Sequence, residues 1–390
     1  MRRSDTITLG RRLLGYLETG TTYVADSSSH NPVASYLDEE QWRTEHSVLF
    51  REQPIVVAMT AQVPSPGDWV TFDLPNLPVL VVRGEDGVAR AFVNACRHRG
   101  VAVCQEPSGH GRKLVCPFHA WTYDTTGALD VIPDAEAVTD VDPAELGLVE
   151  LPASEALGFV WLKPPGSDVA QHLGEPLALE LAGLELADHH HFRSTILEVE
   201  CNWKLMYDTF LEFYHGVYAH KSTLAHLMQR NLVHFDQMGE HWRMAAAKKS
   251  VATLADTPES DWDVLAHVVV SYDIFPNLAV NLHGDHTAVY RIVPDPVRAD
   301  RCLWHFTMLT PEPVTSEKAI GYFAKNFDYI VATGREDMAM ASSTQRGLTS
   351  GANDSLIYSR YEPVLAWFHD RVADELSAAV ARPASSTPES

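Results

Sequence analysis

The sequence has few cysteines, no long apolar run and few basic residues. Its five cysteines are spread over 390 residues and their number is odd, which argues against a disulfide framework. No run approaches the ~20 apolar residues that a membrane-spanning helix needs. The basic start Met1-Arg2-Arg3 is followed by polar residues rather than by the apolar centre of a signal peptide. These absences predict a cytoplasmic protein that does not associate with membranes.

Positive charge is the scarcest property of the chain. Lys and Arg number 30 against 52 Asp and Glu, a net charge of -22. Such a charge repels nucleic acid phosphates and anionic lipid surfaces, so we expect neither as a partner. Small molecules and electron-carrier proteins remain. The length allows two domains with separate cores, and the hydrophobic share of 45% is typical of a globular protein.

The pattern along the chain predicts four segments. Residues 1–46 contain two helix-like stretches and form a helical lead-in that packs on the second domain. Residues 47–155 consist of short β-type runs broken by Gly, Pro and Asp, which predict a small all-β domain. Residues 156–382 mix strands with long helical patterns, which predicts an α+β domain on an antiparallel sheet. The tail, residues 383–390, is rich in Pro and Ser and is expected to be disordered.

The first group of candidate ligands lies in the β domain, where two segments each supply one Cys and one His: Cys96 with His98, and Cys116 with His119. Two thiolates and two imidazoles hold a [2Fe–2S] cluster of the Rieske type. The two loops can clamp the cluster, with the cysteines on one iron and the histidines on the other. A structural zinc ion is the rival, although zinc fingers usually pair Cys with Cys and His with His.

The second group lies in the α+β domain. If residues 204–215 form a helix, Asp208, Glu212 and His215 fall on one face and point into one cavity. His220 lies about 140° further round an ideal helix than His215. Both imidazoles bind one metal only if the helix ends or distorts between them.

Gly216 lies between the two histidines and permits this distortion. Two His and one carboxylate on one face of an Fe(II) ion leave positions open for dioxygen and substrate. This segment therefore predicts a mononuclear non-haem iron site.

Together the two groups resemble the signature of the Rieske non-haem iron oxygenases, in the α (catalytic) subunit of aromatic-ring-hydroxylating-type enzymes. In that family Gly is usual where Ala120 stands here. The resemblance makes Asp337 the carboxylate ligand, together with His215 and His220. Glu336 is the less favoured choice, because on a helix it points about 100° away from Asp337. The resemblance also implies a helix-grip (START-like) catalytic domain.

The resemblance gives Glu212 a bridging role. Its carboxylate would bond an iron histidine on one side and a Rieske histidine of the neighbouring subunit on the other. Glu rather than Asp occurs here in a subset that includes oxygenases of quaternary-ammonium substrates. Asp208 is expected beside the iron. The family's subunits form a head-to-tail homotrimer, with a separate small β subunit in some members.

The implied activity is that of an oxygenase. Electrons pass from NADH or NADPH through a ferredoxin, a flavin reductase or both to the Rieske cluster, and then to the mononuclear Fe(II), where O2 is activated beside a small substrate. Monooxygenation, cis-dihydroxylation and oxidative demethylation are all open, on an aromatic or a quaternary-ammonium compound. Two interpretations of six aromatic residues stay open: they form a cage for an ammonium group, or they belong to the hydrophobic core. These residues are Phe210, Tyr214, Tyr218, Tyr272, Phe275 and Trp304.

Two other classes of function stay open at this point. The chain could be a Rieske electron-transfer protein without oxygenase activity, in which case the second iron site would be empty or degenerate. It could also be a ligand-binding protein of the helix-grip type with a structural zinc ion in the β domain. The complete set of His215, His220 and Asp337 argues against the first of these.

Overall fold

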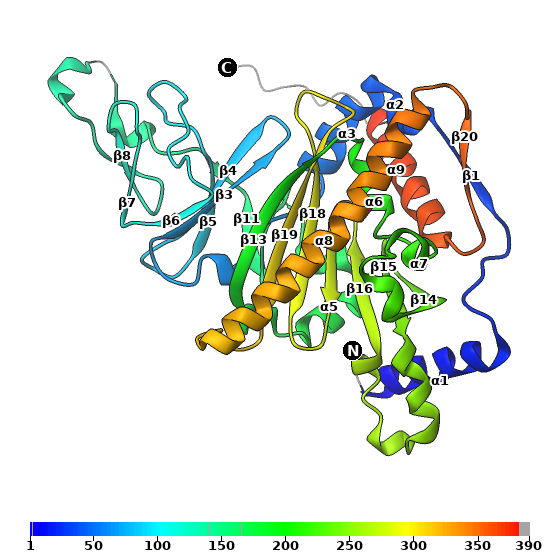
Figure 1. Ribbon diagram of the computed structural model, residues 1–390. Helices are drawn as coiled ribbons and strands as arrows, with labels where there is room; N and C mark the ends of the chain where they lie inside the picture. Colours follow the sequence, from blue (N-terminus) through cyan, green and yellow to red (C-terminus); the bar gives the residue numbers. More distant parts are fainter. Residues whose placement is uncertain (2, 140, 165, 382–390) are drawn as a thin grey trace.

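The computed structural model describes residue 1 and residues 3–139, 141–164 and 166–381. Figure 1 shows a small β unit at one side and a larger, helix-covered sheet at the other. The tail that the sequence predicts to be disordered, residues 383–390, lies outside the described residues. In the described part of the chain, no helix is both long and apolar enough to cross a membrane.

The small unit is made of short antiparallel strands in three sheets, with the orders β10-β5-β4-β3-β6, β7-β8-β9 and β11-β12-β2. Because β2 precedes the other strands and β12 follows them, their pairing closes the unit. The strands are β2 (Ile55–Met59), β3 (Asp68–Leu74), β4 (Leu77–Arg83), β5 (Ala89–Val93), β6 (Ser108–His110), β7 (Lys113–Val115), β8 (Thr122–Asp124), β9 (Leu129–Val131), β10 (Glu150–Leu151), β11 (Ala153–Ala156) and β12 (Phe159–Leu162).

The larger unit is built on one antiparallel sheet of seven strands, in the order β13-β19-β18-β17-β16-β15-β14. The predicted α+β class with an antiparallel sheet is thereby confirmed. The strands are β13 (His190–Val199), β14 (Met228–Met238), β15 (His241–Lys248), β16 (Val268–Ile274), β17 (Leu278–Leu282), β18 (Thr287–Pro294) and β19 (Cys302–Thr310). β14 and β15 lie outside the strands that the sequence predicted.

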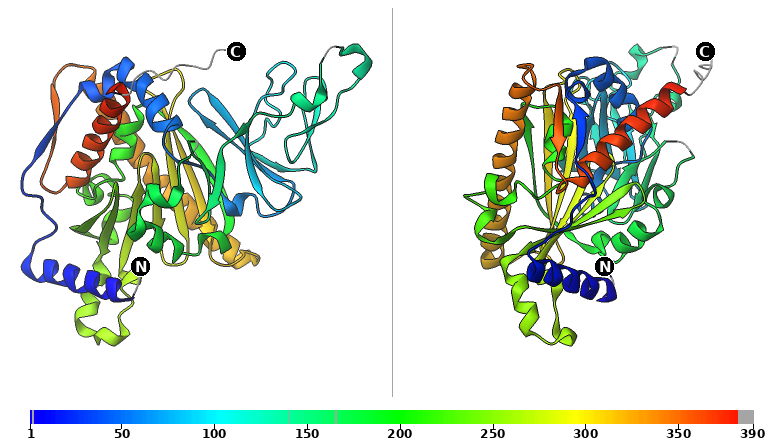
Figure 2. Two further views of the ribbon diagram at one scale, coloured as in Figure 1. Left: turned by 180° about the vertical axis from the view of Figure 1, so that it is seen from behind. Right: turned by 90° about the vertical axis from the view of Figure 1, so that its right-hand side faces the viewer.

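Helices cover both faces of this sheet. Seen from behind in Figure 2, α4 (Val169–Leu173) and α5 (Glu175–Ala182) lie in front of the sheet, and α8 (Glu317–Leu348) lies behind it. α8 crosses the sheet diagonally in Figure 1. It approaches the sheet closely at Gly334, where an added Cβ would lie 2.9 Å from the ring of Trp304.

Both ends of the chain pack on the larger unit. β1 pairs with β20, so the lead-in and the C-terminal segment lie side by side. These elements are α1 (Arg3–Thr19), β1 (Ser29–Pro32), α2 (Ala34–Leu37), α3 (Glu39–Arg51), β20 (Ser355–Tyr358) and α9 (Pro363–Ala381). α3 is joined to the sheet domain by a buried ion pair, in which Lys204 Nζ lies 2.5 Å from Glu45 Oε1.

The expected helix over 204–215 is wrong. The structure instead has α6 (Trp203–Asp208), an irregular stretch, and α7 (Gly216–Ala219). After α6 the chain makes tight turns, with the N–H of Phe210 on the carbonyl of Tyr207 and the N–H of Leu211 on that of Asp208. Further along, Glu212 accepts the N–H groups of Tyr214 and His215, which a continuous helix would bond to backbone carbonyls. Asp208, Glu212 and His215 therefore do not share a helical face.

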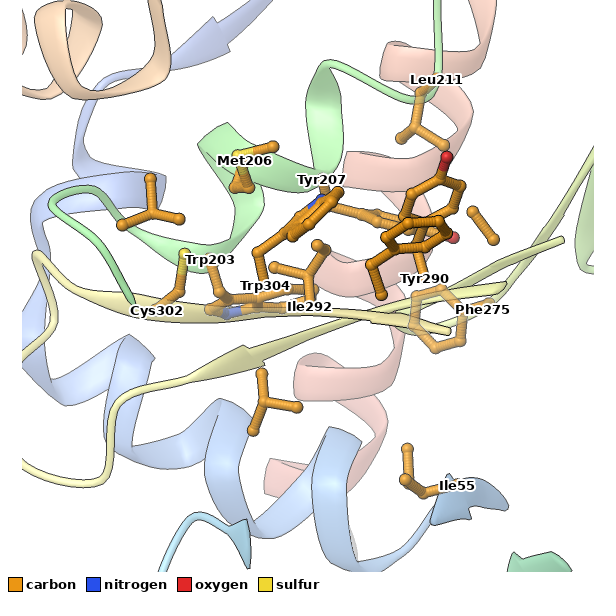
Figure 3. Packing of buried hydrophobic residues seen from close by; sticks show 14 of the residues in the cluster. Ile55, Trp203, Met206, Tyr207, Leu211, Phe275, Tyr290, Ile292, Cys302 and Trp304 are labelled. Atoms are coloured by element: carbon orange, nitrogen blue, oxygen red, sulfur yellow. The ribbon is translucent and has the colours of Figure 1, made fainter. Parts of the chain in front are cut away.

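One hydrophobic core joins the two units. It includes β-unit residues such as Val57 and Phe72 together with Trp203 and Trp304 of the larger unit. In Figure 3 the α6 side chains Met206 and Tyr207 pack above the sheet residues of this core. The core fixes α6, and thereby the start of the segment that carries the candidate iron histidines.

Candidate iron centres

The two Cys–His loops of the β unit make the same turn. The N–H of Gly100 donates to the carbonyl of Cys96 (2.8 Å), and the N–H of Ala120 donates to the carbonyl of Cys116 (3.0 Å). Gly100 has φ 76° and Ala120 has φ 54°, so both occupy the left-handed region. A residue with a Cβ pays about 1–2 kcal/mol there, which explains why Gly would suit the position of Ala120.

The four side chains divide into an inner and an outer pair. Cys96 and Cys116 are buried, while His98 and His119 are exposed with ring centroids 4.6 Å apart. Tyr123 accepts the N–H of Arg97 (2.9 Å), and its hydroxyl lies 3.2 Å from Cys96 Sγ. Two thiols inside and two imidazoles outside fit a cluster with one buried iron and one iron near the surface.

The second group converges on one point. Asp337 Oδ1 lies 3.4 Å from His215 Nε2 and 3.1 Å from His220 Nε2. All three ligand atoms lie within 4.8 Å of one another. Asp337 Oδ1 is buried and accepts no hydrogen bond from the described residues. A cation between the three atoms would satisfy this oxygen, and two His with one carboxylate form a set that suits Fe(II).

Carboxylates hold both imidazoles from behind. Glu212 bonds Nδ1 of His215, and Glu336 Oε2 lies 3.0 Å from Nδ1 of His220. Each Nε2 is therefore left to face the site. Burial lowers the pKa of His215, but Glu212 and Asp337 outweigh it and raise the pKa to about 10. The carboxylates thus favour positive charge at this point.

The role of Glu336 was missed by sequence reasoning, which considered it only as an alternative ligand. Its direction, about 100° around α8 from Asp337, turns it toward His220 and Thr223. The carboxylate of Asp208 accepts from Tyr36 (2.6 Å) and lies 2.9 Å from His369 Nε2. Asp208 is not among the residues that line the cavity described next.

A cavity of about 390 Å³ opens beside the three converging side chains. Part of its wall is aromatic. The ring centroid of Tyr290 lies 4.8 Å from that of Phe210 and 5.5 Å from that of Trp304. Tyr290 was not among the predicted cage residues, of which Phe210 and Trp304 line the cavity. The others do not: Tyr214 and Tyr218 are exposed, and Tyr272 and Phe275 are buried in the core.

Comparison with known proteins matches one family model to each of the two domains. The model of the Rieske [2Fe-2S] domain matches residues 53–142, and the model of the ring hydroxylating alpha subunit (catalytic domain) matches residues 186–378. The glycine betaine monooxygenase oxygenase subunit of Pseudomonas aeruginosa (strain UCBPP-PA14) is 27% identical, over 90% of this chain and 91% of that protein. Choline monooxygenase of Beta vulgaris is 27% identical, over 82% and 71%.

The fold also matches a solved structure. The quaternary ammonium Rieske monooxygenase CntA in complex with L-carnitine has a TM-score of 0.74 at 22% identity, over 90% of this chain and 96% of that one. The cofactors of this architecture are a Rieske [2Fe–2S] cluster and a mononuclear iron, and its enzymes use O2 with electrons from a separate reductase. With both domains present in order, the chain belongs to the Rieske non-haem iron oxygenases, as an α (catalytic) subunit.

Proposed function

We propose that Cys96, His98, Cys116 and His119 hold the Rieske cluster, and that His215, His220 and Asp337 hold the mononuclear iron. The position of Asp337 Oδ1, buried between two imidazole nitrogens, supports the second set. The first set is supported by its separation into buried thiols and exposed imidazoles, because one zinc ion would need all four to converge. Bound iron supplies the activation of O2 by electrons from the cluster.

The protein's own residues prepare the iron site. Glu212 and Glu336 fix the two imidazoles, while the aromatic wall excludes water and positions the substrate. Asp208 connects the end of α6 to two other segments, because its carboxylate contacts Tyr36 of the lead-in and His369 of α9. We assign it a positioning role for the segment that follows, Thr209 to His220.

The substrate we propose is a quaternary-ammonium compound, oxidised on a carbon next to nitrogen. The observation that carries this proposal is the cavity lining, which combines the rings of Phe210, Tyr290 and Trp304 with the carboxylates of Glu212 and Asp337. The ring of Trp304 packs on α8 at Gly334, three residues before Asp337. Aromatic faces and carboxylates both favour a cation. Relatives named for glycine betaine and choline are consistent with it. These names leave open whether the substrate carries a carboxylate, since choline has none.

We also propose that electrons cross between subunits of a head-to-tail homotrimer. The cluster loops, near β7 and β8, and the iron segment, near α7, lie at opposite sides of the molecule in Figure 1. His98 and His119 are exposed at one side, and Tyr214 and Tyr218 are exposed beside Glu212 at the other. A ferredoxin, a flavin reductase or both would deliver electrons from NAD(P)H, and a small β subunit would be an additional partner.

The test is reconstitution with a reductase and NADH. We expect oxygen uptake coupled to ammonium compounds, with formaldehyde released when an N-methyl group is oxidised, and little coupling to aromatics or methylated heterocycles. Coupling to aromatics alone would overturn the substrate proposal. A purified protein that lacks the red-brown colour and visible absorption of a Rieske cluster would overturn the ligand assignment.

A further inference from the structure

Charged side chains of both signs line the cavity: Glu212, Asp285 and Asp337 are acidic, and Lys248 is basic. The end at the candidate iron ligands carries the carboxylates of Glu212 and Asp337 and the aromatic wall. Lys248 lines another part, and among the described lining residues it is the sole lysine or arginine. A cavity lined by anionic and aromatic groups and by an ammonium group matches a ligand that carries both signs of charge.

Strand geometry explains how Lys248 reaches the cavity. Met244, Ala246 and Lys248 alternate along β15, so they lie on the same face of the sheet, and all three line the cavity. On the neighbouring strands Ser271 pairs with Met244, and Asn281 pairs with Ser271, so this face continues across the sheet. Lys248 is the last residue of β15. Its Nζ donates to the carbonyl of Ala266 (3.0 Å), one of the three hydrogen bonds that an ammonium can donate.

Unfilled hydrogen-bonding groups surround this part of the cavity. Nε2 of His283, Nε2 of His286 and Oδ1 of Asn281 are buried without a hydrogen-bond partner among the described residues. Burial lowers the pKa of His283 to about 3, so the ring is neutral and one nitrogen carries a hydrogen to donate. Asp285 is already engaged, by Tyr322 (2.6 Å) and His286 (2.7 Å). His286 uses Nδ1 to bond Asp285, so among these atoms Nε2 of His283 is the one that can donate to an anionic ligand.

The cavity is also long. α8 lines it from Tyr322, which bonds Asp285, to Asp337 at the iron end. That part of the helix spans on the order of 20 Å at about 1.5 Å per residue. A compact cation could fill the aromatic end alone, but reaching both ends requires an elongated molecule.

We propose that Lys248, with His283, binds the carboxylate of an elongated zwitterionic substrate whose quaternary ammonium lies against Phe210, Tyr290 and Trp304. This rests on the proposed function and adds the second charge that selects among ammonium compounds. Lys248 contributes a charge-assisted hydrogen bond to the carboxylate, and His283 donates a neutral one. Both are specificity determinants and neither touches the oxidised carbon.

The test uses ω-trimethylammonio carboxylates of increasing chain length and their methyl esters, with the reconstituted enzyme. Lys248→Gln removes the proposed anchor, and Lys249→Gln is its matched control, because Lys249 is exposed and does not line the cavity. We expect Lys248→Gln to raise KM for the acids about ten- to hundredfold, with kcat and the esters little changed. Lys248→Arg should recover part of the loss, and Lys249→Gln should behave as wild type.

Calorimetric binding of the longest acid provides a readout besides turnover, and the visible spectrum of the cluster confirms that each variant is folded. Equal effects of Lys248→Gln and Lys249→Gln, or equal losses for acids and esters, would overturn this inference. Turnover of esters as efficient as that of acids by the wild type would overturn it too, while leaving the proposed ammonium chemistry intact. If no ammonium compound is oxidised at all, the proposed function itself fails.

Discussion

At the residue scale, two carboxylates contact the imidazole of His220, one at each ring nitrogen. Glu336 bonds Nδ1 of His220 from behind, while Asp337, its neighbour in sequence, faces the iron site. Two adjacent acids on one helix thus act on the same imidazole from two sides. Neither acid can replace the other, because they point in directions about 100° apart.

Replacement of Glu336 by Gln should therefore weaken the iron site without removing a ligand. We expect a loss of about 10- to 100-fold in iron affinity or activity, as is typical for such outer partners. Iron content after dialysis measures the affinity for iron, and substrate-coupled oxygen uptake measures the activity. Arg335→Gln, at an exposed position next to it, is the control and should retain both. If Glu336→Gln binds iron as tightly as the control, the orienting role is wrong.

Ala120 offers a test of backbone strain. Because its φ of 54° is left-handed, Ala120→Gly should stabilise the β unit by about 1 kcal/mol, less the entropy that Gly adds to the unfolded chain. Thermal unfolding followed by loss of the cluster's visible absorption measures this. Gly100→Ala, at the equivalent turn with φ 76°, should destabilise by a similar amount. A destabilised Ala120→Gly variant, or a Gly100→Ala variant as stable as wild type, would contradict the argument.

Asp273 should make stability depend on pH. Burial raises its folded-state pKa to about 8, although Ser271 lowers it, whereas the carboxyl ionises near pH ~4 in the unfolded chain. The folded state therefore retains a proton that the unfolded state loses. The contribution of Asp273 to the free energy of unfolding is complete below pH ~4. It declines by about 1.4 kcal/mol per pH unit up to pH ~8.

Asp273→Asn mimics the protonated acid and should remove this decline. Urea unfolding at pH 5, 6, 7 and 8 would show the variant gaining stability relative to wild type at each step. Parallel pH profiles for the two proteins would contradict the raised pKa.

The sequence predicted which candidate ligands lie together better than it predicted their surroundings. Cys96, His98, Cys116 and His119 lie in two short loops, so local spacing was enough to group them. Asp337 is distant from His215 in sequence, and it was found through family resemblance rather than through spacing. Glu336 and Tyr290 were missed in their observed roles, because side-chain direction depends on how α8 and β18 pack, which no local pattern records.

At the scale of elements, the largest error concerned α6. A 3.6-residue period from 204 to 215 predicted one helix, but α6 ends at Asp208, and Glu212 accepts two backbone N–H groups that a continuous helix would use. The division of the chain at residues 46 and 155 stays a prediction. In the structure α3 extends to Arg51, and β12, which pairs with β2, ends at Leu162.

The ion pair between α3 and α6 should be costly to break. Lys204 and Glu45 are both fully buried, and Glu45 Oε2 also accepts from Trp203 Nε1 (2.8 Å). Lys204→Met leaves the Glu45 carboxylate without its cation, and we expect a loss of about 3–5 kcal/mol in the free energy of unfolding. Urea unfolding measures it. Arg43→Gln breaks an exposed pair with Glu39 on the same helix and should change little.

At the scale of the whole molecule, the separation of the two candidate centres makes the proposed head-to-tail trimer testable. A variant without the cluster, His119→Ala, and a variant without the iron, Asp337→Ala, should each be inactive alone. Co-expressed, they should regain measurable oxygen uptake, because a mixed head-to-tail trimer contains one intact cluster facing one intact iron site. Activity that does not return in mixed trimers, verified by differential tags, would mean that electrons move within one chain.

The placement of α8 has a consequence for protein engineering. The helix that holds Asp337 and Glu336 also forms the cavity wall from Tyr322 to Gly334, so a library of α8 variants would alter substrate range and metal loading together. Positions on β15 and β17 line the same cavity and supply none of the proposed iron ligands. Libraries placed on these strands should therefore yield a larger fraction of iron-loaded enzymes with altered selectivity.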